Sequence, residues 1–140
     1  MPVAATTVSL LGVAHAASVT VSHAEVPATA TVGTDVPLTM TIANQATQPD
    51  ALVRVRCPFA NFSDKYTVDY GEGAPARRAI SAIPVPAGAT VALTTKSYHV
   101  MLLQTRAPLS EGQMLRCSVA FRVAGTIDVA VQVAPAATPP

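Results

Sequence analysis

Aromatic and charged residues are both scarce in this chain of 140 residues. It has no Trp, aromatic residues make up 4% of the sequence, and charged residues make up 12%. So small a charged fraction argues against coiled coils, long solvated helices and intrinsic disorder. Nine Lys+Arg against eight Asp+Glu leave a net charge of +1, so there is no basic field to attract nucleic acid. The length is that of one ordinary domain.

Aliphatic residues and turn formers are plentiful. Hydrophobic residues make up 50% of the chain, and 12 Pro and 7 Gly supply chain reversals. Residues 36–43 alternate between apolar and polar side chains, which is the period of a strand, and residues 115–123 and 126–133 flank a Gly turn like a hairpin. Further short strands are expected at residues 19–26, 52–57, 66–70, 80–85, 91–93 and 98–103. The pattern predicts an all-β sandwich or barrel of about eight or nine short strands.

The amino terminus has the features of an export signal. Residues 1–24 contain no Asp, Glu, Lys or Arg, and a short apolar run ends in Ala14-His15-Ala16. Small residues three and one before a cut suit signal peptidase, so residues 1–16 are predicted to be a signal-peptide remnant, although the usual initial Lys or Arg is absent. The run is too short to span a bilayer. We therefore expect a domain over residues 17–134 without a membrane span, and a flexible Ala/Pro tail at 135–140.

The chain has two cysteines, Cys57 and Cys117. In an oxidising compartment outside the cytoplasm they could form a disulfide. Both lie in or beside apolar segments, where two separate buried thiols are equally compatible with the sequence. The sequence leaves these alternatives open.

A search for catalytic chemistry finds no enzyme. There is no phosphate-binding loop and no nucleophile elbow. Neither cysteine carries a local signature that would make it a nucleophile partnered by His99. Asp64, Asp69 and Glu72 occupy positions typical of solvent-facing charges. Without an activated nucleophile or an acid–base pair, no catalytic site can be assembled.

The tripeptide His99-Val100-Met101 is the most informative local feature. Alternate side chains of a strand leave on the same face, so His99 and Met101 project together, with Cα atoms about 7 Å apart. A neutral imidazole beside a soft thioether favours Cu(I) over a hard cation. Taken alone, a His-x-Met in a strand is more often an ordinary histidine at the rim of an apolar face.

Longer blocks of sequence add a family resemblance. Residues 83–93, 98–103 and 108–112, together with 40–44 and 49–53, resemble the periplasmic Cu(A) chaperone family, PCuAC. The resemblance covers nearly all of the expected mature chain. It implies a cupredoxin-like Greek-key β-sandwich and a periplasmic location. It also implies that Cu(I) is carried to a copper-accepting protein, such as the Cu(A) site of cytochrome oxidase.

The copper motif of that family is only half present. The family has a His, ten residues, a Met, twenty-one residues and then His-x-Met, so His99 and Met101 match while Tyr66 and Arg77 replace the other two ligands. A guanidinium cannot act as a ligand, and a phenol is a poor one for Cu(I). The metal ligands implied are therefore His99 and Met101 alone, in a site that is weak or binds no copper. The alternative is a ligandless relative that acts as a periplasmic interaction or structural module.

Overall fold

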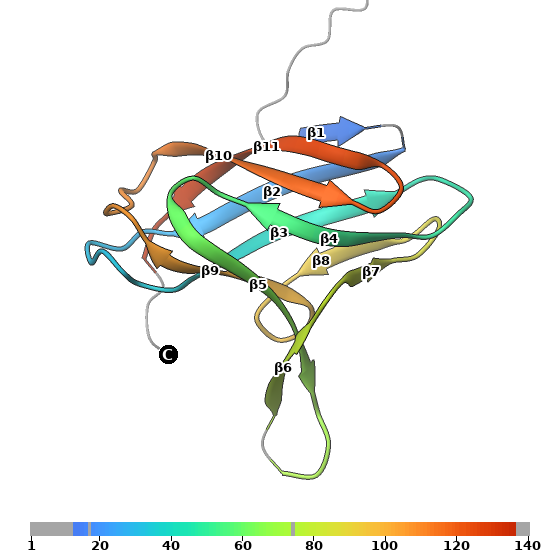
Figure 1. Cartoon of the computed structure of the whole chain (residues 1–140), viewed down its shortest axis with the longest axis horizontal. Coiled ribbons are helices and arrows are strands. Elements are labelled where there is room, and N and C mark those ends of the chain that lie inside the picture. Colours follow the sequence, from blue (N-terminus) through green and yellow to red (C-terminus); the bar gives the residue numbers. More distant parts are fainter. Residues whose placement is uncertain (1–12, 17, 74, 137–140) are drawn as a thin grey trace, which may run out of the picture.

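The protein is an all-β sandwich, as the sequence predicts (Figure 1). The computed structural model describes residues 13–16, 18–73 and 75–136, and within these ranges no residue is helical. In these ranges no long apolar helix is available to cross a bilayer. The strands are β1 (Val13–Ala16), β2 (Val19–Pro27), β3 (Val36–Asn44), β4 (Asp50–Arg56), β5 (Ala60–Asp69), β6 (Ala76–Ile80), β7 (Ile83–Val85), β8 (Thr90–Leu93), β9 (His99–Thr105), β10 (Met114–Phe121) and β11 (Gly125–Ala134).

The strands are hydrogen-bonded in the order β6-β5-β9-β3-β2-β11-β10-β4-β7, with β1 added to β2 and β8 added to β3. Strand β3 joins the two layers, because residues 36–38 pair with β9 while residues 40–43 pair with β8. The β2–β11 pair is parallel, and the other pairs between described strands are antiparallel. The β5–β9–β3 part of this arrangement carries His99 and Met101.

The core consists of aliphatic side chains from both layers. Strand β3 alternates strictly between buried and half-buried residues, as its sequence predicts. Among the three phenylalanines only Phe121 is buried, so shape matching of Val, Leu and Ile fills the interior. The largest fully buried apolar side chains are Val21, Val26, Leu38, Ile42, Leu52, Ile83, Val85, Leu93, Val100, Leu102 and Val119.

The region from residue 60 to residue 85 differs from the sequence-based expectation. The expected strand 66–70 is the end of the longer β5, and the expected strand 80–85 is wrong, because its ends lie in β6 and β7. Much of β5 and β6 is exposed, so polar side chains are tolerated at strand positions and the hydrophobic period disappears. The far ends of β5 and β6 form a hairpin that projects from the sandwich (Figure 1). This region thus contains three strands where two were expected, and with β1 the described residues form 11 strands instead of the nine expected.

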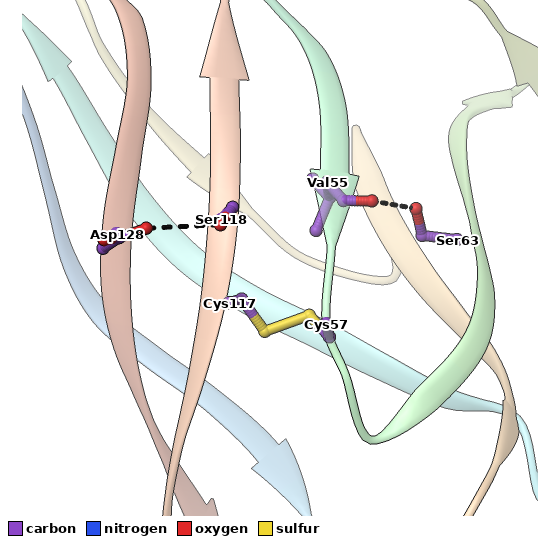
Figure 2. The surroundings of a disulfide bond; sticks show 6 residues. All are labelled: Val55, Cys57, Ser63, Cys117, Ser118 and Asp128. Atoms are coloured by element: carbon purple, nitrogen blue, oxygen red, sulfur yellow. Dashed lines mark hydrogen bonds between the residues drawn. A yellow bond between two sulfur atoms is a disulfide. The ribbon is translucent and has the colours of Figure 1, made fainter.

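Cys57 and Cys117 form a disulfide, which decides between the two alternatives that the sequence left open (Figure 2). Cys57 directly follows β4, and Cys117 lies in β10, the neighbour of β4. Both residues are buried. The chain turns from β4 into β5 immediately after Cys57, so the disulfide fixes the point from which the site-bearing strand departs.

Two expectations concern the ends of the chain. Residues 13–16 of the predicted signal segment form β1, which pairs with β2, while residues 1–12 lie outside the described residues. Cleavage after Ala16 therefore stays a prediction. In the predicted tail, residues 135 and 136 are exposed and not in a strand, and residues 137–140 lie outside the described residues.

Candidate functional site

The site is built on the pairing of β9 with β5. In this register His99 lies opposite Tyr66. Val100 and Leu102 are fully buried in the core, so His99 and Met101 leave β9 on its other face, as the sequence predicts. His99 is 2% exposed, and Met101 is half-buried. The imidazole and the thioether therefore share one face of the sheet beside Tyr66.

A backbone hydrogen bond fixes the chemical state of the His99 ring. Its Nδ1 atom lies 2.9 Å from the carbonyl oxygen of Ser97. A carbonyl oxygen can only accept, so Nδ1 carries a proton and donates it. In the neutral ring this leaves a lone pair on Nε2, to which no described residue forms a hydrogen bond. An imidazole held by Nδ1–H on a backbone carbonyl is in the tautomer that binds metal through Nε2.

Tyr66 stacks on His99. The two ring centroids are 5.5 Å apart, and the ring planes are inclined by 26°. Burial raises the pKa of the Tyr66 phenol above 10.0, the negative charge of Asp64 raises it further, and the positive charge of Arg77 opposes the shift. The phenol is therefore protonated at neutral pH, and it supports the imidazole as a neutral ring instead of providing an anionic ligand.

Arg77, at the second replaced ligand position, lies over Tyr66, at the first. Its guanidinium carbon is 4.5 Å from the centroid of the Tyr66 ring, which is a cation–π contact. Its neighbour Arg78, on the opposite face of β6, instead donates to the Asp69 carboxylate at 2.9 Å. No described carboxylate forms an ion pair with Arg77. Tyr66 thus lies beside His99, while Arg77 lies over Tyr66 and lines the same hollow as His99, which places a fixed positive charge near the imidazole.

A hollow of about 420 Å³ opens beside Arg77 and His99. It lies between the projecting hairpin and the turn before β9, and the Tyr70 hydroxyl donates to the Lys96 carbonyl oxygen across the two segments. The lining residues are Val68, Tyr70, Pro75, Arg77, Thr95, Lys96 and His99. Sequence analysis did not single out Tyr70 or Lys96 as site residues, because only the tertiary fold brings the hairpin against the turn.

The donor set for a metal ion is small. No three His, Cys, Asp or Glu side chains of the described residues are close enough together to hold one. The two cysteines are joined to each other and offer no thiolate. A soft ion at this site would therefore depend on His99 and Met101, the pair that the sequence indicates.

Solved structures with a similar fold include PCuAC domains. The copper-bound PCuAC domain of PmoF2 has a TM-score of 0.76 and 20% identity, over 89% of this chain and 99% of that one. The apo PCuAC domain of PmoF1 has a TM-score of 0.75 and 19% identity, over 88% and 98%. Cu(I)-bound DR1885 from Deinococcus radiodurans has a TM-score of 0.64 and 25% identity, over 81% and 78%. The protein is therefore a PCuAC-type, cupredoxin-like β-sandwich.

A comparison of the sequence with family models assigns the chain to a particular family. Residues 19–133 match a family described as putative lipoprotein LpqE-like. The chain belongs to this LpqE-like family. No curated protein matches the sequence. The family match and the PCuAC neighbours confirm the resemblance found in the sequence, and with it the copper chaperone-like fold.

Proposed function

We propose that this protein is an exported copper-binding protein that holds Cu(I) between His99 Nε2 and the Met101 sulfur. The observation that carries the proposal is the Nδ1–H bond to the Ser97 carbonyl, because it leaves Nε2 as the free ligand atom. Met101 leaves the same face of β9 and supplies a soft sulfur. Copper here is cargo, and the proposal assigns the protein no catalytic step.

We expect a low affinity for Cu(I), and a low affinity suits a carrier because the metal must be released to an acceptor. Tyr66 is a neutral phenol, and Arg77 is a cation that cannot ligate, so at most two side chains of the four-ligand pattern bind copper. A two-ligand Cu(I) complex leaves coordination positions open for the ligands of an acceptor. Copper would then pass by ligand exchange to a cuproprotein, for example the Cu(A) site of cytochrome oxidase.

A periplasmic location is part of the same proposal. The Cys57–Cys117 disulfide supports it, since stable disulfides belong to oxidising compartments. The description of the family as putative lipoproteins also supports it. Detection of the native protein in a periplasmic fraction with its disulfide intact is the expected result, and recovery only from the cytoplasm would contradict it.

Competition titration tests the copper site. Cu(I) is supplied anaerobically as a chelator complex, without thiols, so that the disulfide remains intact. We expect a 1:1 complex, and we expect His99→Ala and Met101→Leu each to weaken it by at least about tenfold. His23→Ala, at an exposed histidine on β2, is the matched control and should not change the affinity. Thermal unfolding of each variant separates ligand loss from misfolding.

A ligandless interaction module is the second candidate function. The cation–π contact of Arg77 with Tyr66 favours it, because two of the four ligand positions of the family hold side chains that bind each other. In this case wild type would form no Cu(I) complex at micromolar copper, and His99→Ala would have no effect. The titration therefore separates the two functions directly.

A further inference from the structure

We propose that the hollow beside His99 binds a small organic carboxylate, and that Arg77 is the residue that binds the carboxylate group. This inference does not depend on copper binding. Arg77, Lys96 and His99 all line the hollow, and none of its described lining residues is Asp or Glu. Two of the three are permanent cations at neutral pH, so the charge of this hollow favours an anion.

The guanidinium of Arg77 is held in place by Tyr66 but has no carboxylate partner among the described residues. Its Cζ atom lies 4.5 Å from the centroid of the Tyr66 ring, and this contact uses none of the five N–H donors that a guanidinium carries. Arg78 shows what the same side chain does when a carboxylate is near, since its Nε and an Nη donate to the two oxygens of Asp69, at 2.9 and 3.3 Å. No described carboxylate does this for Arg77. The planar fork matches a carboxylate in two-point contact.

The remaining walls suit an organic body better than a bare inorganic ion. Val68, Tyr70 and Pro75 contribute apolar surface from the hairpin. The volume of about 420 Å³ lies in the range of small-molecule sites. Lys96 adds a positive charge on a flexible stem at the turn. A ligand with one carboxylate and an apolar or aromatic body uses each of these features.

The hollow is also held in shape. The Tyr70 hydroxyl bonds to the Lys96 carbonyl and so ties the hairpin to the turn. The turn is closed by a backbone bond from Thr94 N–H to the Tyr98 carbonyl oxygen at 3.1 Å. Because hairpin and turn are linked before any ligand arrives, less ordering is needed on binding.

Titration with benzoate tests the proposal. Metal-free protein in a buffer without chelators or other carboxylates is followed by NMR at low ionic strength. We expect saturable binding with a dissociation constant of about 1 mM, typical of so small a ligand on an open site, and shifts confined to the hairpin, residues 94–98 and the His99 ring. Benzamide, which lacks the charge, and inorganic phosphate, which lacks the apolar body, should each bind at least about tenfold more weakly.

Matched variants of Arg77 and Arg78 test which arginine binds the carboxylate. Arg77→Met should weaken benzoate binding by about tenfold or more, because it removes a charge-assisted two-point contact. Arg77→Lys, which keeps the charge and loses the fork, should recover only part of the affinity. Arg78→Met, on the opposite face of the same strand, should leave it unchanged. Thermal unfolding checks that each variant is folded.

Several results would overturn the proposal. Absence of saturable benzoate binding, or binding unaffected by Arg77→Met, would exclude this site. Equal binding of benzamide or phosphate would exclude the carboxylate class. These readouts contain no copper, so failure here and failure of the copper titration are distinguishable.

Discussion

The imidazole of His99 lies against the phenol ring of Tyr66, with the ring centroids 5.5 Å apart, because β9 and β5 pair these two residues directly. A histidine at position 66 would therefore face His99 across the strand pair. Arg77 lies over the same Tyr66 ring. One short stretch of sheet thus brings together the residues that match the copper pattern described for the PCuAC family and the residues that replace its other two ligands.

Restoring that pattern should create a strong copper site. We expect Tyr66→His combined with Arg77→Met to raise the Cu(I) affinity by at least about tenfold for each added ligand. The measurement is anaerobic competition with a Cu(I) chelator. The control is Tyr66→Phe with Arg77→Leu, which removes the same phenol and charge without adding a ligand. Equal gains in both double variants would mean that charge removal, not ligation, is responsible.

The Cys57–Cys117 disulfide should stabilise the fold substantially. It links residues separated by 60 positions, and in the chain-entropy model a loop of that size contributes about 4 kcal/mol. We expect the free energy of unfolding in urea to fall by about that amount in the double variant Cys57→Ala, Cys117→Ala. A reductant should destabilise the wild type and leave the variant unchanged. An unchanged urea midpoint in the double variant would contradict the prediction.

Asp50 should be a structural anchor. Its buried carboxylate accepts N–H bonds from Ala51 and Val123 at 2.8 Å and from Ala124 at 2.9 Å, so it holds the turn between β10 and β11 against β4. Asp50→Ala leaves three donors without their acceptor and should cost about 3 kcal/mol of unfolding free energy. Asp128→Ala, at an exposed carboxylate on β11, should change it by less than about 0.5 kcal/mol. Similar losses in both variants would reject a special role for Asp50.

The Arg78–Asp69 ion pair on the projecting hairpin should break in acid. The hydrogen bond from Arg78 holds the pKa of Asp69 below its ordinary value of 3.8. A carboxyl whose pKa is lowered by folding stabilises the fold above its ordinary pKa and loses that contribution as the pH falls through the lowered value. We expect the Arg78 Nε–H signal in NMR to shift below about pH 4. Asp69→Asn should abolish this transition, and its persistence there would assign it to another group.

The sequence is enough to predict the sandwich and the shared face of His99 and Met101. The alternation in β3 fixes which side chains are buried, and the turn after β10 is marked by Gly125, whose φ of 84° favours glycine. His99 and Met101 share a face simply because β9 is extended. Asp50, by contrast, sits in a stretch that reads as a polar loop, and nothing local shows that its carboxylate is buried.

Local period and family spacing are enough to predict the strands, the turns and the positions equivalent to the copper pattern. Tertiary structure decided the rest. It alone joined Cys57 to Cys117, stacked Tyr66 on His99 and set the hairpin against the turn at Lys96. These contacts join segments far apart in the chain, and short-range preferences of the backbone do not encode which distant surfaces will meet.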